Sequence, residues 1–177
     1  MEKKLSLWKV DLKYNQDLSR YDENVMSISP QLGKENRPFI GILIMVNGKQ
    51  YCAPITSPKP KHSTMPKSFD YLKITKKSGD NEKLIGVINF NNMIPVHPSV
   101  IEQIDISIRK NDPPYIKNYK ELLTDELDWC QKHSDIIQKN SQKTYKMITE
   151  GKAKASLVRR CCDFKKLEAV LEKKLGI

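Results

Sequence analysis

Apolar and β-branched residues gather in short runs over the first hundred positions of the chain. Residues 5–10 alternate apolar and polar side chains, and residues 39–46 are almost continuously apolar; both patterns are typical of β-strands. The short connections between these runs favour antiparallel pairing. Residues 100–108 fit a strand or a helical turn equally well. The pattern therefore predicts about six mostly antiparallel strands, at residues 5–10, 39–46, 49–55, 69–75, 84–90 and 93–96.

The dipeptide Asn47–Gly48 separates two of these runs and is a strong signal for a tight β-hairpin. We expect this hairpin to form the centre of the sheet. Its return strand leads directly into Thr56 and Ser57. Antiparallel neighbours bring the start of one strand beside the end of the other. Arg37, just before the first strand of the hairpin, is therefore expected near Ser57.

The second half of the chain has helical periodicity. Apolar residues recur at intervals of three and four over residues 116–137, after a start signal at Asp112 and Pro113–Pro114. The apolar stripe includes His133, which we expect to lie in the core. The spacing predicts one long amphipathic helix that ends by Gly151, with a possible bend at the polar residues 138–143.

Two shorter helical patterns complete the chain. One predicts a helix over residues 164–175, closed by Gly176, and the other predicts a helical turn at residues 18–26, followed by a long polar loop up to Pro38. Strands that precede helices, rather than alternating with them, indicate an α+β fold. We predict a single domain, residues 1–177, with a strongly twisted antiparallel sheet in the form of a partial barrel and C-terminal helices packed on it.

The charge balance points to a polyanionic partner. The 177 residues include 31 Lys and Arg against 21 Asp and Glu, a net charge of +10. Nucleic acid is the usual partner of a small basic domain, with anionic lipid as the competitor. The sequence has neither a membrane-spanning apolar run nor an apolar signal core, and its four cysteines form no C-x-x-C pair. We therefore expect a cytoplasmic protein with no membrane partner.

Candidate chemistry begins at the segment Thr56–Ser57–Pro58–Lys59, here called the T-S-P-K loop. Proline fixes φ and restricts the preceding residue, so this loop has a stiff backbone just past a strand end. On spacing alone an ordinary exposed turn is the favoured reading. The functional alternative is that hydroxyl and backbone N–H groups contact a phosphate while Lys59 neutralises its charge. Further contacts along an RNA strand would then come from Lys61, His62 and Lys67.

Rival chemistries have weaker support. A serine hydrolase needs a G-x-S-x-G turn, and Ser57 has no flanking glycine. Cys130 lies three residues before His133, but amphipathic periodicity explains the pair without zinc. We expect no metal site and no cofactor. A second basic cluster near the C-terminus is either a solvated helix entry or a patch that follows phosphates, and consists of Lys152, Lys154, Arg159 and Arg160.

Taken together, these segments resemble the ToxN/AbiQ family of type III toxins, whose antitoxin is an RNA. The resemblance spans nearly the whole chain in order, and the T-S-P-K loop after the hairpin is its most specific part. The matching segments are Phe39–Ile42, Tyr51–Lys59, Ile85–Asn89, Met93–Val96, Pro114–Tyr115, Cys162–Phe164 and Lys166–Glu168.

The resemblance implies a fold similar to the MazF and Kid toxins. It also implies a sequence-preferring endoribonuclease that cuts cellular mRNA and processes its own repeated antitoxin RNA. In this family pattern Thr56 and Ser57 match a hydroxyl pair, Lys59 a loop lysine, and Tyr14 a tyrosine that follows the first strand. Arg37 falls where the family can have lysine, and the planar guanidinium changes the geometry of that charge. A second tyrosine of the family pattern has no clear counterpart in this sequence.

The implied reaction is attack of the substrate's own 2′-OH on the adjacent phosphate, which leaves 2′,3′-cyclic phosphate and 5′-OH ends. This route needs no metal and excludes DNA as a substrate. The implied partner is a pseudoknot antitoxin RNA in a closed cyclic assembly, with three toxins and three RNAs. Two alternatives stay open, a non-catalytic RNA-binding module and a toxin neutralised by a protein. No residue has an obvious claim to be the general base.

Overall fold

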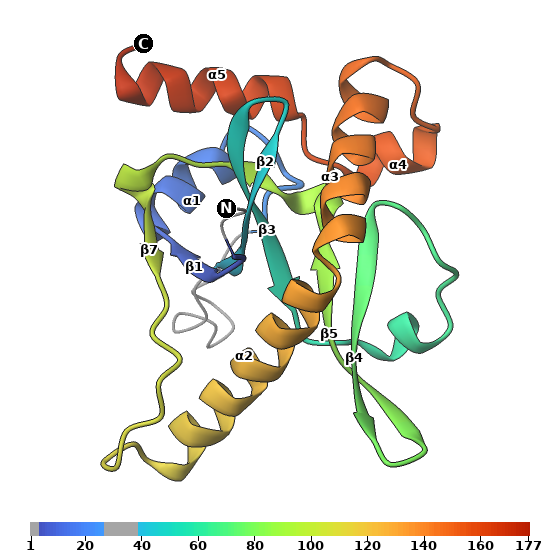
Figure 1. Cartoon of the computed structure of the whole chain (residues 1–177). Coiled ribbons are helices and arrows are strands. Elements are labelled where there is room, and N and C mark those ends of the chain that lie inside the picture. The colour runs from blue at the N-terminus through green and yellow to red at the C-terminus, as the bar shows by residue number, and fades with distance from the viewer. Residues whose placement is uncertain (1–3, 27–38) are drawn as a thin grey trace.

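The computed structural model of the protein describes residues 4–26 and 39–177, so Arg37 lies outside the described residues. Within the described part of the chain, seven strands form one sheet with the order β4-β5-β3-β2-β1-β7, and β6 pairs with β3 off this path (Figure 1). All pairings are antiparallel, as expected. The strands are β1 (Leu7–Val10), β2 (Ile40–Val46), β3 (Lys49–Thr56), β4 (Tyr71–Ser78), β5 (Asn81–Asn89), β6 (Ile94–Pro95) and β7 (Ile101–Gln103).

The β2–β3 hairpin confirms the prediction made from Asn47–Gly48. Both residues have positive φ, 51° and 74°, as a tight hairpin turn requires. The pairing runs from Gly41↔Pro54 to Val46↔Lys49. A Cβ on Gly41 would lie 2.1 Å from the carbonyl oxygen of Ala53, so the close approach of the two strands requires glycine at this position.

Strand β3 belongs to both halves of the sheet. Its first part pairs with β2, and its last two residues, Ile55 and Thr56, pair with Ile88 and Val87 of β5. In Figure 1 the β4–β5 hairpin therefore projects away from β1 and β2, and β3 runs between the two parts. This switch of partner strand places the end of β3 at the junction of the two halves.

The helices differ from the sequence prediction. The expected single long helix is two, because His133 leaves helical geometry with φ −117° and ψ 25°, and residues 138–143 lie inside an unbroken helix. The first helix begins and ends earlier than predicted. Residues 100–108, which fitted a strand or a helical turn, contain the last residue of a 3₁₀ turn and the short strand β7. The helices are α1 (Leu12–Ser19), α2 (Pro114–Lys132), α3 (Ser134–Thr149), α4 (Ala155–Arg160) and α5 (Phe164–Leu175), with short 3₁₀ turns η2 (Pro60–Ser63), η3 (Phe90–Asn92) and η4 (Pro98–Val100).

His133 explains the break between α2 and α3. Its ring stacks on Trp129 with centroids 3.9 Å apart, and its Nδ1 lies 2.7 Å from the carbonyl oxygen of Trp129. A carbonyl oxygen only accepts, so Nδ1 donates. This bond closes the last turn of α2. His133 is exposed, contrary to the expectation that it lies in the core.

A buried polar cluster fixes α3 and α5 to the start of β3. The hydroxyls of Tyr51 and Tyr145 donate to Glu168 Oε1 over 2.6 and 2.8 Å, and Lys49 Nζ donates to Glu168 Oε2 over 3.0 Å and to Glu172 over 2.9 Å. Burial raises the pKa of the Glu168 carboxyl, but these hydrogen bonds hold it below its ordinary value. The α+β prediction with C-terminal helices on the sheet is confirmed, and the clamped start of β3 sets the position of its far end.

Candidate active site at the end of β3

The T-S-P-K loop leaves the sheet where β3 ends. Thr56 is the last paired residue, and the loop then continues into η2 (Figure 1). Ser57 and Lys59 are exposed, as expected. Neither side chain bonds to another residue in the described part of the chain, so both can contact a ligand.

Asn89 orients the first hydroxyl of the loop and was missed by the sequence analysis. Its Nδ2 donates to Thr56 Oγ1 over 3.0 Å from the neighbouring strand β5. Since this bond uses an acceptor site of the hydroxyl, the hydroxyl proton remains available to a phosphate oxygen. The signal in the sequence was a polar residue that ends an apolar strand, but only the β3–β5 pairing brings it to Thr56.

His62 fixes the conformation of the loop from inside. Its ring Nδ1 accepts a hydrogen bond from the backbone N–H of Lys59 over 2.8 Å, and its own backbone N–H donates to the Lys59 carbonyl over 2.9 Å. Burial, and then the charges of Lys61, Lys59 and Lys73, lower the pKa of the imidazole. His62 is 6% exposed. The geometry gives this neutral ring a positioning role, and its contact with RNA stays a prediction.

The lysines around the loop divide into anchored and exposed ones. Lys73 Nζ donates to the carbonyl of Met65 over 2.8 Å, which ties the loop to β4. Lys61 and Lys67 are exposed and form no ion pair with another described residue. Their predicted role in RNA binding is untested, and their exposure is compatible with it.

Arg160 fixes the far end of the segment that leads from the T-S-P-K loop to β4. Its Nε and Nη2 donate to the two carboxylate oxygens of Asp70 over 2.9 and 3.1 Å, and Asp70 also accepts from Ser68 and Asn91. Burial raises the pKa of the Asp70 carboxyl, but these hydrogen bonds bring it below its ordinary value. Much of Arg160's hydrogen-bonding capacity is therefore used within the fold. The role predicted for it in RNA binding stays a prediction.

The other members of the predicted C-terminal basic cluster are exposed. Lys152 pairs with Glu150 over 3.0 Å, Lys154 precedes α4, and Arg159 lies in its last turn. None of them forms a hydrogen bond or ion pair with the T-S-P-K loop in the described part of the chain. They form a separate basic region beside α3 and α4 rather than part of the site at the end of β3.

Tyr14 lies in the core rather than on the surface of the loop. It is on α1, 0% exposed, and its hydroxyl donates to the carbonyl of Pro95 over 2.6 Å. Burial raises the pKa of this hydroxyl well above its ordinary value. This placement favours a structural role for Tyr14, and the catalytic role implied by the resemblance stays a prediction, as does that of Arg37.

A buried carboxyl lies close to the end of β3. Glu126 of α2 packs on β5, where a Cβ on Gly86 would lie 2.7 Å from its Oε1 and 3.4 Å from Ile55 of β3. Burial, and then the charge of Asp125, raise the pKa of Glu126 to about 7. Its side chain is 4% exposed. The glycine in β5 thus makes room for α2 to cross the sheet.

Within residues 4–26 and 39–177, no three His, Cys, Asp or Glu side chains gather as metal ligands, and the four cysteines are buried and unpaired. None of the described helices is long and apolar enough to cross a membrane. The arrangement that remains is a stiff loop with an oriented hydroxyl, a free hydroxyl and a free ammonium. Hydroxyl and ammonium donors on a fixed loop at a strand end are the groups that suit a class of phosphate-binding proteins.

The comparisons with known proteins identify the family. The profile of the toxin ToxN of type III toxin–antitoxin systems matches residues 6–172, and the chain belongs to this family. It is 32% identical over 139 residues to the endoribonuclease ToxN of Bacillus thuringiensis subsp. kurstaki, over 76% of this chain and 67% of that protein. It is 27% identical over 164 residues to the endoribonuclease ToxN of Pectobacterium atrosepticum, over 93% of this chain and 90% of that protein.

Solved structures of similar systems have the same fold. One, from a type III system whose toxin is inhibited by a non-coding RNA pseudoknot, has a TM-score of 0.80 at 24% identity and covers 99% of this chain and 100% of that one. AbiQ, a lactococcal anti-phage endoribonuclease, has a TM-score of 0.79 at 21% identity, over 97% and 99% of the two chains. A third, from an antiviral system regulated by a processed non-coding RNA, has a TM-score of 0.73 at 25% identity, over 93% and 95%.

Proposed function

We propose that this protein is an endoribonuclease toxin that cleaves cellular mRNA and its own repeat antitoxin RNA at the T-S-P-K loop without a metal ion. The proposal rests on how the side chains of Thr56, Ser57 and Lys59 are placed in the T-S-P-K loop. Asn89 orients the Thr56 hydroxyl, while the Ser57 and Lys59 side chains are exposed and bond to no other described residue, on a loop that His62 fixes from inside. Family membership supports the same reaction class, since both curated relatives are endoribonucleases.

The proposed reaction is an intramolecular transesterification. The substrate's 2′ oxygen forms a bond to the adjacent phosphorus, the bond from phosphorus to the 5′ oxygen breaks, the 2′ proton leaves, and the departing 5′ oxygen takes up a proton. Thr56 and Ser57 donate to non-bridging oxygens, and Lys59, with Arg37, stabilises the negative charge that develops there. The products are a 2′,3′-cyclic phosphate and a 5′-OH. No described residue is assigned as the general base.

The proposed partner is a folded antitoxin RNA that keeps the toxin inactive. We propose a closed cyclic assembly of three toxins and three pseudoknot RNAs, in which single-stranded RNA ends occupy the cleavage site at the T-S-P-K loop. The net charge of +10 supports such extensive RNA contact. The family of type III systems supports a role in abortive infection of phage-infected cells or in plasmid maintenance.

The test is cleavage of a single-stranded RNA by purified protein in EDTA, with analysis of the product ends. Wild type should give cyclic phosphate ends, and Ser57→Ala should lower the rate about 10²–10³-fold, as expected for loss of one donor to developing charge. Ser63→Ala is a matched control, because Ser63 is an exposed hydroxyl at the end of η2 that bonds only to the Pro60 carbonyl. Binding without cleavage by wild type would instead indicate a non-catalytic RNA-binding module.

A further inference from the structure

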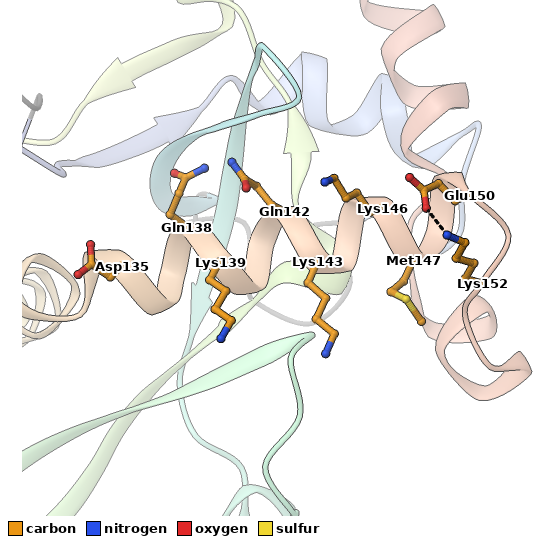
Figure 2. Close-up of a pocket in the computed structure, with 9 residues that line it drawn as sticks. All are labelled: Asp135, Gln138, Lys139, Gln142, Lys143, Lys146, Met147, Glu150 and Lys152. Atoms are coloured by element: carbon orange, nitrogen blue, oxygen red, sulfur yellow. Dashed lines mark ion pairs between the residues drawn. The ribbon is translucent and has the colours of Figure 1, made fainter.

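The exposed face of α3 forms a second basic surface away from the T-S-P-K loop. An open groove of about 600 Å³ runs along this helix. Figure 2 shows Lys139 and Lys143 projecting from one side of it, and Gln142 and Lys146 from the other. Lys139 and Lys146 lie seven residues apart, so they span roughly 10 Å of helix at 1.5 Å per residue. The positive charges of these two lysines therefore extend over a length comparable to a short stretch of nucleic-acid backbone.

Two lysines of this groove, Lys139 and Lys146, remain available for binding. The two acidic residues of the groove lie at its ends: Asp135 is in the first turn of α3, and Glu150 pairs with Lys152 over 3.0 Å. Lys139 and Lys146 have no ion pair within residues 4–26 and 39–177. Among the described residues, the middle of the groove is thus positive without a counter-charge.

The segment between the T-S-P-K loop and β4 connects this loop to the groove. Lys143 Nζ lies 4.7 Å from the centre of the Phe69 ring, and Thr144 Oγ1 donates to the Phe69 carbonyl over 3.2 Å. Residues 60–69 lead back from this contact to Lys59. A polyanion that binds the α3 face would therefore approach the connection that continues from the T-S-P-K loop.

From this geometry we infer that the α3 face is a docking surface for the backbone of folded RNA, a role that rests on the proposed function. Proteins that hold single strands stack the bases on aromatic side chains, and no aromatic residue lines this groove. Base-paired RNA presents phosphates and 2′-hydroxyls along a rigid surface, which the lysines and the amide of Gln142 can contact. The amide nitrogen of Gln138 already donates to the Met45 carbonyl over 2.6 Å. Met147 is the one apolar lining residue, too little apolar surface for membrane insertion.

The test compares Lys139→Gln/Lys146→Gln with Lys173→Gln/Lys174→Gln. Both double variants remove two exposed positive charges from a helix, and the second pair lies in the last turn of α5, whose C-terminal end Figure 1 places away from α3. The probes are a 16-base-pair RNA duplex, a length of about one dsRNA-binding footprint, and an oligouridine of matching length. Binding is measured by fluorescence anisotropy over a range of salt concentrations.

We expect the α3 variant to bind the duplex about tenfold more weakly, with a salt slope reduced by about 1 for each lysine. Its affinity for oligouridine should change less than twofold, and the α5 variant should match wild type with both probes. Equal weakening of the duplex by both variants, equal loss of both probes, or no change would each overturn the inference. Cleavage by wild type, measured in parallel, tests the proposed function separately, so the two failures can be told apart.

Discussion

The two ends of β3 carry similar chemical groups in opposite states. At the start of the strand, Lys49 and Tyr51 are joined to Glu168, a carboxyl that is 4% exposed and also accepts from Tyr145. At the end of the strand, Ser57 and Lys59 offer a hydroxyl and an ammonium that contact no other described residue.

This difference separates groups that serve folding from groups that serve a ligand. Buried polar groups need partners, and a satisfied cluster stabilises one arrangement of the elements that contribute to it. Because a stiff loop is already ordered, exposed donors on it lose less conformational entropy when they bind a ligand. Changes at the start of β3 should therefore reduce stability, and changes at its end should reduce activity.

The largest expected effect is on stability, at the start of the strand. Glu168→Ala removes the acceptor shared by Tyr51, Tyr145 and Lys49. The buried Tyr51 hydroxyl then loses its partner, and the Tyr145 hydroxyl keeps only the bond that it accepts from Asn47 Nδ2 over 3.4 Å. Loss of one member of a buried charged cluster costs about 3–5 kcal/mol, and the partial exposure of Lys49 places the expected loss at the lower end. Urea unfolding followed by circular dichroism measures it. A variant as stable as wild type would contradict the role of the cluster.

The pH dependence of stability sharpens this test. The hydrogen bonds from Tyr51, Tyr145 and Lys49 hold the folded-state pKa of Glu168 below 4.5, despite its burial. A carboxyl with a lowered pKa contributes stability above its unfolded value and loses this contribution as the pH falls through the folded value. Wild type should therefore lose stability below about pH 4.5, and Glu168→Gln should lose less over the same range.

The next effect is on activity, at the end of the strand. Lys59→Ala should lower the cleavage rate about 10²-fold, because it removes a charge near the developing phosphorane. The melting temperature should stay within about a degree of wild type, since the side chain is exposed and substitutions at such positions cost little. Lys77→Ala, at an exposed position late in β4, is the control. A large fall in melting temperature would contradict the assignment of Lys59 to the active site.

The smallest expected effect is at His62, which positions the loop without contacting the reacting atoms. His62→Ala removes the acceptor of the Lys59 N–H and should lower the cleavage rate about tenfold, the equivalent of one hydrogen bond of about 1–1.5 kcal/mol. His62→Asn keeps an acceptor near the position of Nδ1 and should restore most of the rate.

The pH profile distinguishes this role from a general loosening of the loop. The folded-state pKa of His62 lies below 6.5, because of burial and the nearby charges of Lys61, Lys59 and Lys73. Protonation of Nδ1 in acid would break the bond to Lys59. Wild type should therefore lose activity as the pH falls below this lowered value, and the asparagine variant should lack that step. Identical profiles would contradict the positioning role.

Local sequence signals determined much of the fold. Alternating and continuous apolar runs located the strands, and Asn47–Gly48 fixed the hairpin, because only residues that tolerate positive φ form this turn. Proline spacing and exposed polar residues after β3 located the T-S-P-K loop, and the exposure expected of Lys59 is confirmed. These features depend on neighbouring residues, so a local pattern carries them.

Only the tertiary structure decided which of these groups have partners. Asn89 reaches Thr56 because β5 pairs with the end of β3, thirty-three positions earlier in the chain, and Arg160 joins Asp70 across ninety positions. Tyr14, expected at the site, has its hydroxyl in the core against Pro95. Periodicity also could not foresee the break at His133, which depends on the contact of its ring with Trp129. Hydrogen bonds between distant segments depend on packing, and no local pattern in one sequence records them.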